Sequence, residues 1–140
     1  VSADAALFFS WESWWAAENE GRPSEALTYL GQVHAAHAAL SDAGVTTDVV
    51  RPGGDLDGYR LLIVPALHLI SDADAAAITR AVENGATALI TFFSGIVDEQ
   101  DRVRTGGYPG AVRDLLGIRS EEFAPLRPGE TVFLTDGTSG

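Results

Sequence analysis

Residues 61–93, LLIVPALHLISDADAAAITRAVENGATALITFF, carry the pattern that decides the fold. The runs at 61–64 and 88–93 are apolar at successive positions and too short for helices, which predicts strands buried on both faces. Between them, Ser71 precedes two aspartates as a helix N-terminal cap would, with the acid three residues on reaching back to it. Gly85 then ends the helix. A strand, a helix and a second strand in this order predict a parallel pair.

The sequence on either side extends this alternation. Residues 5–9 form another short apolar run, and the β-branched residues 46–50 end at a turn, so both segments predict strands. A helix is predicted from Ser24 to Gly44, with an apolar stripe at spacings of three or four that comprises Leu27, Leu30, Val33, His37 and Leu40. A short helix at 111–116 follows a long loop. Together these elements predict an α/β fold, with three layers around a doubly wound, mainly parallel sheet of flavodoxin-like topology.

The composition excludes several functional classes. All nine basic residues are arginine, and the 20 acidic ones give a formal charge of -11, so the surface would repel a phosphate backbone and we predict no nucleic-acid partner. No apolar stretch approaches the ~20 residues that cross a bilayer, which predicts no membrane partner. The chain has no cysteine, and therefore no disulfide and no thiolate site. Absence of cysteine is compatible with the cytosol, and we expect a cytoplasmic protein.

The motifs of nucleotide binding and of nucleophilic catalysis are missing. A receiver domain needs acids at the ends of its first and third strands and a lysine, but Ser10 and Pro65 occupy those positions and the chain has no lysine. Tryptophans stand where a phosphate-binding loop would need glycines. Ser94 could have His68 and Asp98 as partners, but an irregular loop follows it instead of the helix of a nucleophile elbow. We therefore interpret Ser94 as a turn hydroxyl.

Metal and cofactor binding are not favoured either. The charged cluster after the last predicted strand lacks the spacing of a calcium loop, and its arginines can neutralise its acids; it comprises Asp98, Glu99, Asp101, Arg102 and Arg104. We interpret this cluster as solvated or as part of an interface. His34 and His37 are three residues apart, but no third ligand is evident. We predict packing and surface roles for both histidines, and neither a metal nor a cofactor.

Aromatic residues point instead to an interface. Trp11, Trp14 and Trp15 lie within five residues, and so small a domain cannot easily bury all three. Protein interfaces concentrate aromatic residues and arginine. The alternative is a small core cluster packed against the long helix. The loop at 94–110 is also long for a compact domain, and such loops are more often functional than accidental.

Ordered motifs along the chain resemble the middle domain of the family 42 glycoside hydrolases, which are β-galactosidases. These motifs are WESWW at 11–15, FSGIVDE at 93–99 and GGYPG at 106–110, with GYR at 58–60, LLG at 115–117 and EEF at 121–123. The resemblance covers about residues 5 to 130. Since motifs in the same order extend over nearly the whole chain, the resemblance is specific.

The resemblance implies a three-domain enzyme. A (β/α)8 barrel carries both glutamates of the retaining mechanism, and this class I glutamine amidotransferase-like domain and a small β domain follow it. The middle domain mediates trimerisation, so the implied partners are further copies of the enzyme and its barrel, and galactoside binds only to the parent enzyme. No catalytic residue is expected in this chain. We expect the middle domain at residues 1–125, and at 126–140 an edge segment and linker towards a C-terminal domain.

The predicted interface or pocket-wall residues come from the segments that follow the first and last strands; they are Trp11, Trp14, Trp15, Phe93, Asp98, Arg102 and Tyr108. An aromatic side chain of the first segment could also wall the substrate pocket of a neighbouring protomer. The alternative function is a free-standing flavodoxin-like domain that binds a small molecule at its strand ends.

Overall fold

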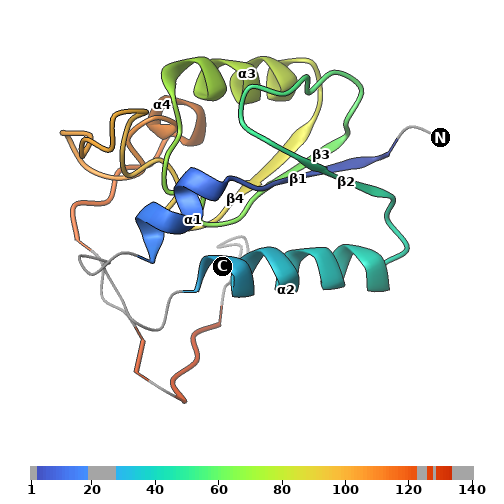
Figure 1. Cartoon of the computed structure of the whole chain (residues 1–140), viewed down its shortest axis with the longest axis horizontal. Coiled ribbons are helices and arrows are strands. Elements are labelled where there is room, and N and C mark those ends of the chain that lie inside the picture. The colour runs from blue at the N-terminus through green and yellow to red at the C-terminus, as the bar shows by residue number, and fades with distance from the viewer. Residues whose placement is uncertain (1–2, 19–27, 123–125, 128, 134–140) are drawn as a thin grey trace, which may run out of the picture.

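The computed structural model describes residues 3–18, 28–122, 126–127 and 129–133 (Figure 1). Its elements are β1 (Ala5–Phe8), α1 (Trp11–Ala17), α2 (Tyr29–Asp42), β2 (Thr47–Val50), β3 (Leu61–Val64), α3 (Asp72–Glu83), β4 (Thr87–Ile90) and α4 (Arg113–Leu116). The four described strands form one parallel sheet in the order β2-β1-β3-β4, as in flavodoxin-like sheets. Helix α2 covers one face, and α3 and α4 cover the other. The predicted three-layer, doubly wound α/β fold is confirmed.

The two central strands are buried on both faces, as predicted. On β1, Ala6 and Phe8 pack in the cluster beneath α3 and α4, whereas Ala5 and Leu7 pack in the cluster beneath α2. Strand β3 divides its side chains in the same way. This double burial is typical of the centre of a parallel sheet and explains why these runs contain no polar side chain.

Tyr29 joins the end of β1 to the start of α2. Its side chain is fully buried, and its hydroxyl accepts a hydrogen bond from the N–H of Ser10 at 2.9 Å. Burial raises the pKa of Tyr29 to about 12, and the bond from Ser10 opposes this only in part. The contact fixes the point at which the chain leaves the sheet and enters α1.

The last strand differs from the prediction. The sequence predicts burial of residues 88–93 on both faces, but β4 ends at Ile90, and Phe92 and Phe93 lie in a turn. Strand β4 is an edge strand, and its Leu89 is 56% exposed because α2 covers only the centre of that face. The order of the strands in the sheet decides which strands lie at its edges. The local sequence does not encode this order, and so the exposure of β4 was not predicted.

The segment after β1, in which the sequence predicts no helix, forms α1. Ser10 has extended backbone and caps α1, because its hydroxyl oxygen accepts the N–H of Ser13 at 3.1 Å. The tryptophans at 11, 14 and 15 share one side of the helix, and Ser13 and Ala17 are its buried residues. The available signal was a serine directly before apolar residues at helical spacing.

Helix α2 confirms the predicted stripe at Val33 and Leu40; Leu30 is half-buried, and Leu27 lies outside the described residues. Tyr29, Val33 and Leu40 are its buried residues. The placement of His37 on the apolar stripe is wrong, because this side chain is exposed, as is His34. The predicted start at Ser24 lies outside the described residues; α2 begins at Tyr29.

The N-terminus of α3 is capped by Ser71, as predicted. The Ser71 hydroxyl accepts the N–H of Asp74 at 3.1 Å. The carboxylate of Asp74 does not complete the reciprocal half of the motif. It accepts instead the hydroxyl of Ser71 and the N–H of Gly53 at 2.7 Å, and so ties the turn after β2 to α3.

Replacing Ser71 with alanine should lower the free energy of unfolding by about 1 kcal/mol, because the N–H of Asp74 loses its acceptor. Urea unfolding followed by circular dichroism measures the difference. Ser41→Ala, at an exposed position near the end of α2, is the control and should change the value by less than about 0.5 kcal/mol. Equal midpoints for wild type and Ser71→Ala would mean that the cap does not stabilise the fold.

The described residues after 125 are all exposed. Leu126 is 50% exposed, Val132 is 65% exposed and Phe133 is 94% exposed. The boundary at residue 125 stays a prediction. In the described part of the chain, no helix has the length and apolar character that a bilayer crossing requires.

Candidate functional site

The usual ligand position of a doubly wound sheet is closed in this protein. Such sheets bind ligands where the strand order reverses, which here is between the carboxyl ends of β1 and β3. Helix α1 lies across this point, since the Ser13 hydroxyl is 3.0 Å from the N–H of Leu69 and 3.4 Å from its carbonyl oxygen. Ser13 is fully buried. An open groove of about 960 Å³ runs beside it, at the ends of β1 and β2; it is lined by Phe9, Trp11, Glu12, Leu69 and residues 49–55 among others.

The three tryptophans of α1 divide between core and surface. Trp14 is half-buried and packs against the cluster beneath α2, so the core alternative holds for this residue. Trp11 is 55% exposed and Trp15 is 67% exposed. The Trp11 ring lies 5.1 Å from the ring of Phe9, 5.3 Å from Trp14 and 6.4 Å from Trp15, measured between centroids. The rings therefore form one packed aromatic cluster with an open outer side.

The loop after β4 is anchored at its start by Ser94. This buried hydroxyl donates to the carbonyl of Val64 at 3.2 Å and accepts the N–H of Leu67 at 3.1 Å. Because both interactions are with the backbone of the β3 end, the side chain is a structural bridge. This agrees with the interpretation of Ser94 as a turn hydroxyl rather than a nucleophile.

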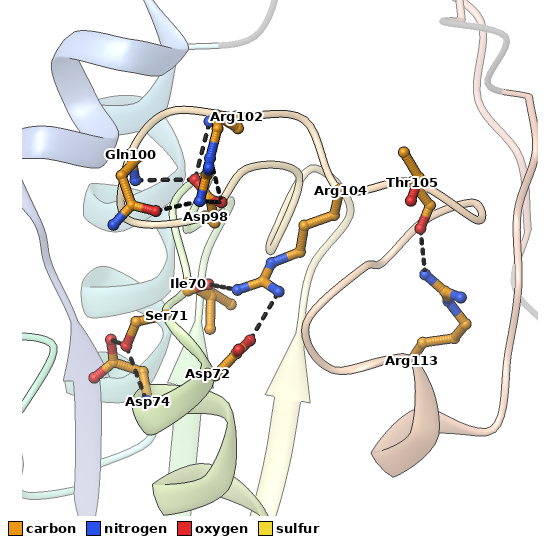
Figure 2. Close-up of polar contacts among 10 residues, drawn as sticks. All are labelled: Ile70, Ser71, Asp72, Asp74, Asp98, Gln100, Arg102, Arg104, Thr105 and Arg113. Carbon is orange, nitrogen blue, oxygen red and sulfur yellow. Dashed lines mark hydrogen bonds and ion pairs between the residues drawn. The ribbon is translucent and has the colours of Figure 1, made fainter.

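Two of the predicted interface residues, Asp98 and Arg102, pair with each other. The Asp98 carboxylate accepts the N–H groups of Gln100 and Arg102 at 2.9 and 3.0 Å and the Arg102 Nε at 3.0 Å (Figure 2). Desolvation alone would raise the pKa of Asp98, but these hydrogen bonds and the guanidinium of Arg102 outweigh it and lower the pKa. Asp98 therefore shapes the turn at the tip of the loop.

Arg104 fastens the same loop to α3. Its guanidinium forms an ion pair with Asp72 at 2.8 Å and donates to the carbonyl of Ile70 at 2.9 Å (Figure 2). The Arg104 side chain is 19% exposed, whereas Asp72 is 89% exposed. The expectation that Arg104 neutralises the acids beside it in sequence is wrong, since its partner is 32 residues away at the start of α3. A Cβ atom at Gly110 would lie 2.6 Å from the Cβ and Cδ of Arg104, so glycine is needed there.

Arg113 holds the next part of the loop. Its guanidinium donates to the carbonyls of Thr105 and Gly107 at 3.2 and 3.0 Å; the Thr105 contact is drawn in Figure 2. Phe93 and Tyr108, the remaining predicted residues, both line a small apolar pocket of about 80 Å³ at the end of β4. The structure therefore places them together, in a different pocket from the groove beside Trp11.

Helix α1 and the tip of the loop are joined through Leu69. Ser13 of α1 bonds to the backbone of Leu69, and Leu69 pairs with Val97 in a parallel bridge. Val97 also pairs with Val103, which closes the loop tip. We call the exposed residues of these two neighbouring segments the strand-end surface, defined as Trp11, Glu12, Trp15 and residues 99–103.

His68 lies beneath this surface and is 9% exposed. Its backbone carbonyl accepts the N–H groups of Ile96 and Val97 at 2.9 and 3.2 Å, which joins the end of β3 to the loop. Burial lowers the pKa of His68, and the charge of Asp101 opposes this in part. The imidazole is therefore neutral in the folded protein at neutral pH.

This pKa shift predicts a loss of stability in mild acid. The unfolded chain binds the His68 proton near pH 6.5 and the folded chain only at lower pH, so stability is full above 6.5 and falls below it. His68→Gln cannot take up this proton. Its free energy of unfolding, measured in urea at pH 7.5 and pH 5, should depend less on pH than that of the wild type. Equal pH dependence in the two proteins would contradict the account.

Among the described residues, no group of three histidine, aspartate or glutamate side chains could hold a metal ion. His34 and His37 are both on the exposed side of α2.

Comparisons with known proteins cover nearly the whole chain. A family model described as "Beta-galactosidase trimerisation domain" matches residues 3–139. A β-galactosidase from Arthrobacter sp is 49% identical over 138 residues, which are 99% of this chain and 20% of that protein. The β-galactosidase bgaB of Geobacillus kaustophilus is 43% identical over 89% of this chain and 19% of its own length. This chain therefore spans about a fifth of these curated relatives.

Solved structures agree with the sequence matches. The β-galactosidase of Bacillus circulans sp. alkalophilus superposes with a TM-score of 0.87 and 40% identity, over 91% of this chain and 19% of that chain. The enzyme of the haloarchaeon Halorubrum lacusprofundi gives a TM-score of 0.85 and 29% identity over 92% of this chain and 19% of its own.

Proposed function

Since this chain belongs to the β-galactosidase trimerisation domain family, we propose that it is the non-catalytic domain that holds three copies of a β-galactosidase together. The observation that carries the proposal is the outward exposure of Trp11 and Trp15, at 55% and 67%. Exposed tryptophans clustered at one site are typical of interface hot spots. The partners are further copies of the parent enzyme, reached through its barrel.

We further propose that the parent enzyme hydrolyses terminal β-D-galactosyl residues with retention of configuration. Retaining glycosidases use two carboxyl groups about 5 Å apart, one as acid and base and one as nucleophile. Both belong to the barrel in this proposal, and galactoside is bound there rather than by this chain. A cytoplasmic location, compatible with the absence of cysteine, is part of the same proposal.

The loop at 94–110 supports this role because its shape is determined within the domain. Ser94, Arg104 and Arg113 each bind backbone carbonyls on or beside the loop. A loop that is already ordered loses less conformational entropy on binding. The free-standing ligand-binding alternative is not favoured, because α1 closes the crevice where such domains hold their ligands.

The proposal is tested by separating assembly from hydrolysis. The full-length enzyme should cleave a chromogenic β-galactoside and sediment as a trimer, and the 140-residue chain should cleave none of it. Activity of the chain alone, persisting after repurification, would contradict the assignment of catalysis to another domain. A full-length enzyme that sediments as a monomer would contradict the assignment of the trimer.

A further inference from the structure

The strand-end surface combines its exposed tryptophans with an excess of negative charge. Glu12, Glu99 and Asp101 are exposed, and within the described residues none of them is in an ion pair. Asp98 and Arg102 neutralise each other at 3.0 Å. Arg51 lines the same groove as Trp11 and Glu12. Its single positive charge can neutralise only one of the three carboxylates. The surface around the aromatic cluster is therefore net negative.

Half of the described arginines of this domain already have partners. In the described part of the chain, Arg102, Arg104 and Arg119 are in ion pairs with carboxylates, and Arg113 binds backbone carbonyls. The other described arginines are Arg51, Arg60, Arg80 and Arg127.

A second copy of this domain is accordingly a poor electrostatic partner. The domain carries a formal charge of -11, so two copies repel each other. A cyclic trimer also joins two different patches of the protomer, since head-to-tail contacts close the ring. The relatives are about five times as long as this chain, so most of the parent's surface lies in other domains.

We propose that the strand-end surface docks on a positively charged surface with an apolar centre, outside this domain on the neighbouring protomer, and that charge attraction steers assembly. This inference rests on the proposed function and names the chemistry of its partner. Arginine fits best, because its guanidinium both pairs with carboxylates and stacks on indole rings. Carboxylates at the rim of the strand-end surface accelerate association of the protomers. The tryptophans form the centre of the interface, from which water is excluded.

The test reverses the unpaired charges in the full-length enzyme. Glu99→Arg/Asp101→Arg should raise the dissociation constant of the trimer by about tenfold or more in 50 mM salt, measured by sedimentation. At 1 M salt the Debye length is only ~3 Å, and the difference from wild type should largely vanish. Asp42→Arg/Glu83→Arg is the matched control, because these exposed residues lie at the amino end of the sheet and the change in net charge is equal. It should assemble like the wild type.

A milder variant guards against misfolding. Glu99→Gln/Asp101→Asn removes the charges with almost no change of shape, and should weaken the trimer in the same direction by a smaller factor. The inference is overturned if both variants assemble like the control at low salt. If both charge variants assemble like the control but replacement of Trp11 and Trp15 dissociates the trimer, the strand-end surface is still the interface. In that case only the proposed positive charge of the partner is wrong. A wild type that is not trimeric would remove the proposed function itself.

Discussion

Replacing Trp11 and Trp15 together with alanine should dissociate the trimeric enzyme. Hot-spot tryptophans contribute about 2 kcal/mol or more each on truncation, so the double variant should raise the trimer dissociation constant by roughly 1,000-fold. The effect on folding should be small, because the two side chains are 55% and 67% exposed. Sedimentation of the full-length enzyme across concentration measures the first quantity, and urea unfolding the second.

The structure also selects the right control for this experiment. Leu89 is 56% exposed, an exposed fraction similar to that of Trp11, but it lies on the edge strand β4. Leu89→Ala should leave the trimer intact. Trp14 is unsuitable as a target, since it packs against the cluster beneath α2 and its loss would also destabilise the domain. A double variant that remains trimeric at the lowest measurable concentration would show that these tryptophans are not the interface.

Replacing Arg104 with alanine should cost about 2 kcal/mol of unfolding free energy and weaken the trimer as well. The carbonyl of Ile70 loses a charged donor at 2.9 Å, and the loop loses its link to Asp72. Asp72 itself is 89% exposed and becomes hydrated, which keeps the cost below that of a fully buried pair. Amide hydrogen exchange over residues 95–105 should accelerate, because the loop opens locally.

Two further variants separate the role of the Arg104 contacts from a general loss of charge. Arg104→Lys keeps the charge but loses the guanidinium, which contacts Asp72 and the carbonyl of Ile70 through different nitrogens. Its trimer dissociation constant should therefore lie between those of the wild type and the alanine variant. Arg119→Ala removes an exposed ion pair with Glu121 and should change stability by less than about 0.5 kcal/mol. Unchanged exchange and unchanged assembly in Arg104→Ala would mean that the loop does not depend on this arginine.

The sequence predicts a structural element well where that element depends only on residues close together in the chain. The strands at 5–8 and 61–64 are buried on both faces, and their unbroken apolar runs predict this directly. The cap at Ser71 is equally local, since hydroxyl and N–H are three residues apart. Helix α1 was missed because seven residues hold too few turns for its periodicity to stand out against a loop.

The candidate site was only partly predictable, because its contacts join distant segments. The exposed aromatic cluster follows from three tryptophans in a small domain, but the burial of Trp14 depends on where α2 lies. The partner of Arg104 comes from α3, and the spacing along the chain favoured the nearer acids instead. The pairing of Asp98 with Arg102 agrees with the expectation that the arginines of this cluster neutralise its acids, because the two residues are only four apart in sequence.

The molar mass of the full-length wild-type enzyme is the most direct test of the proposed trimer. Light scattering over a wide range of concentration measures it without assumptions about shape. We expect three times the mass of one protomer at every concentration above the dissociation constant. A constant mass of one or two protomers would contradict it.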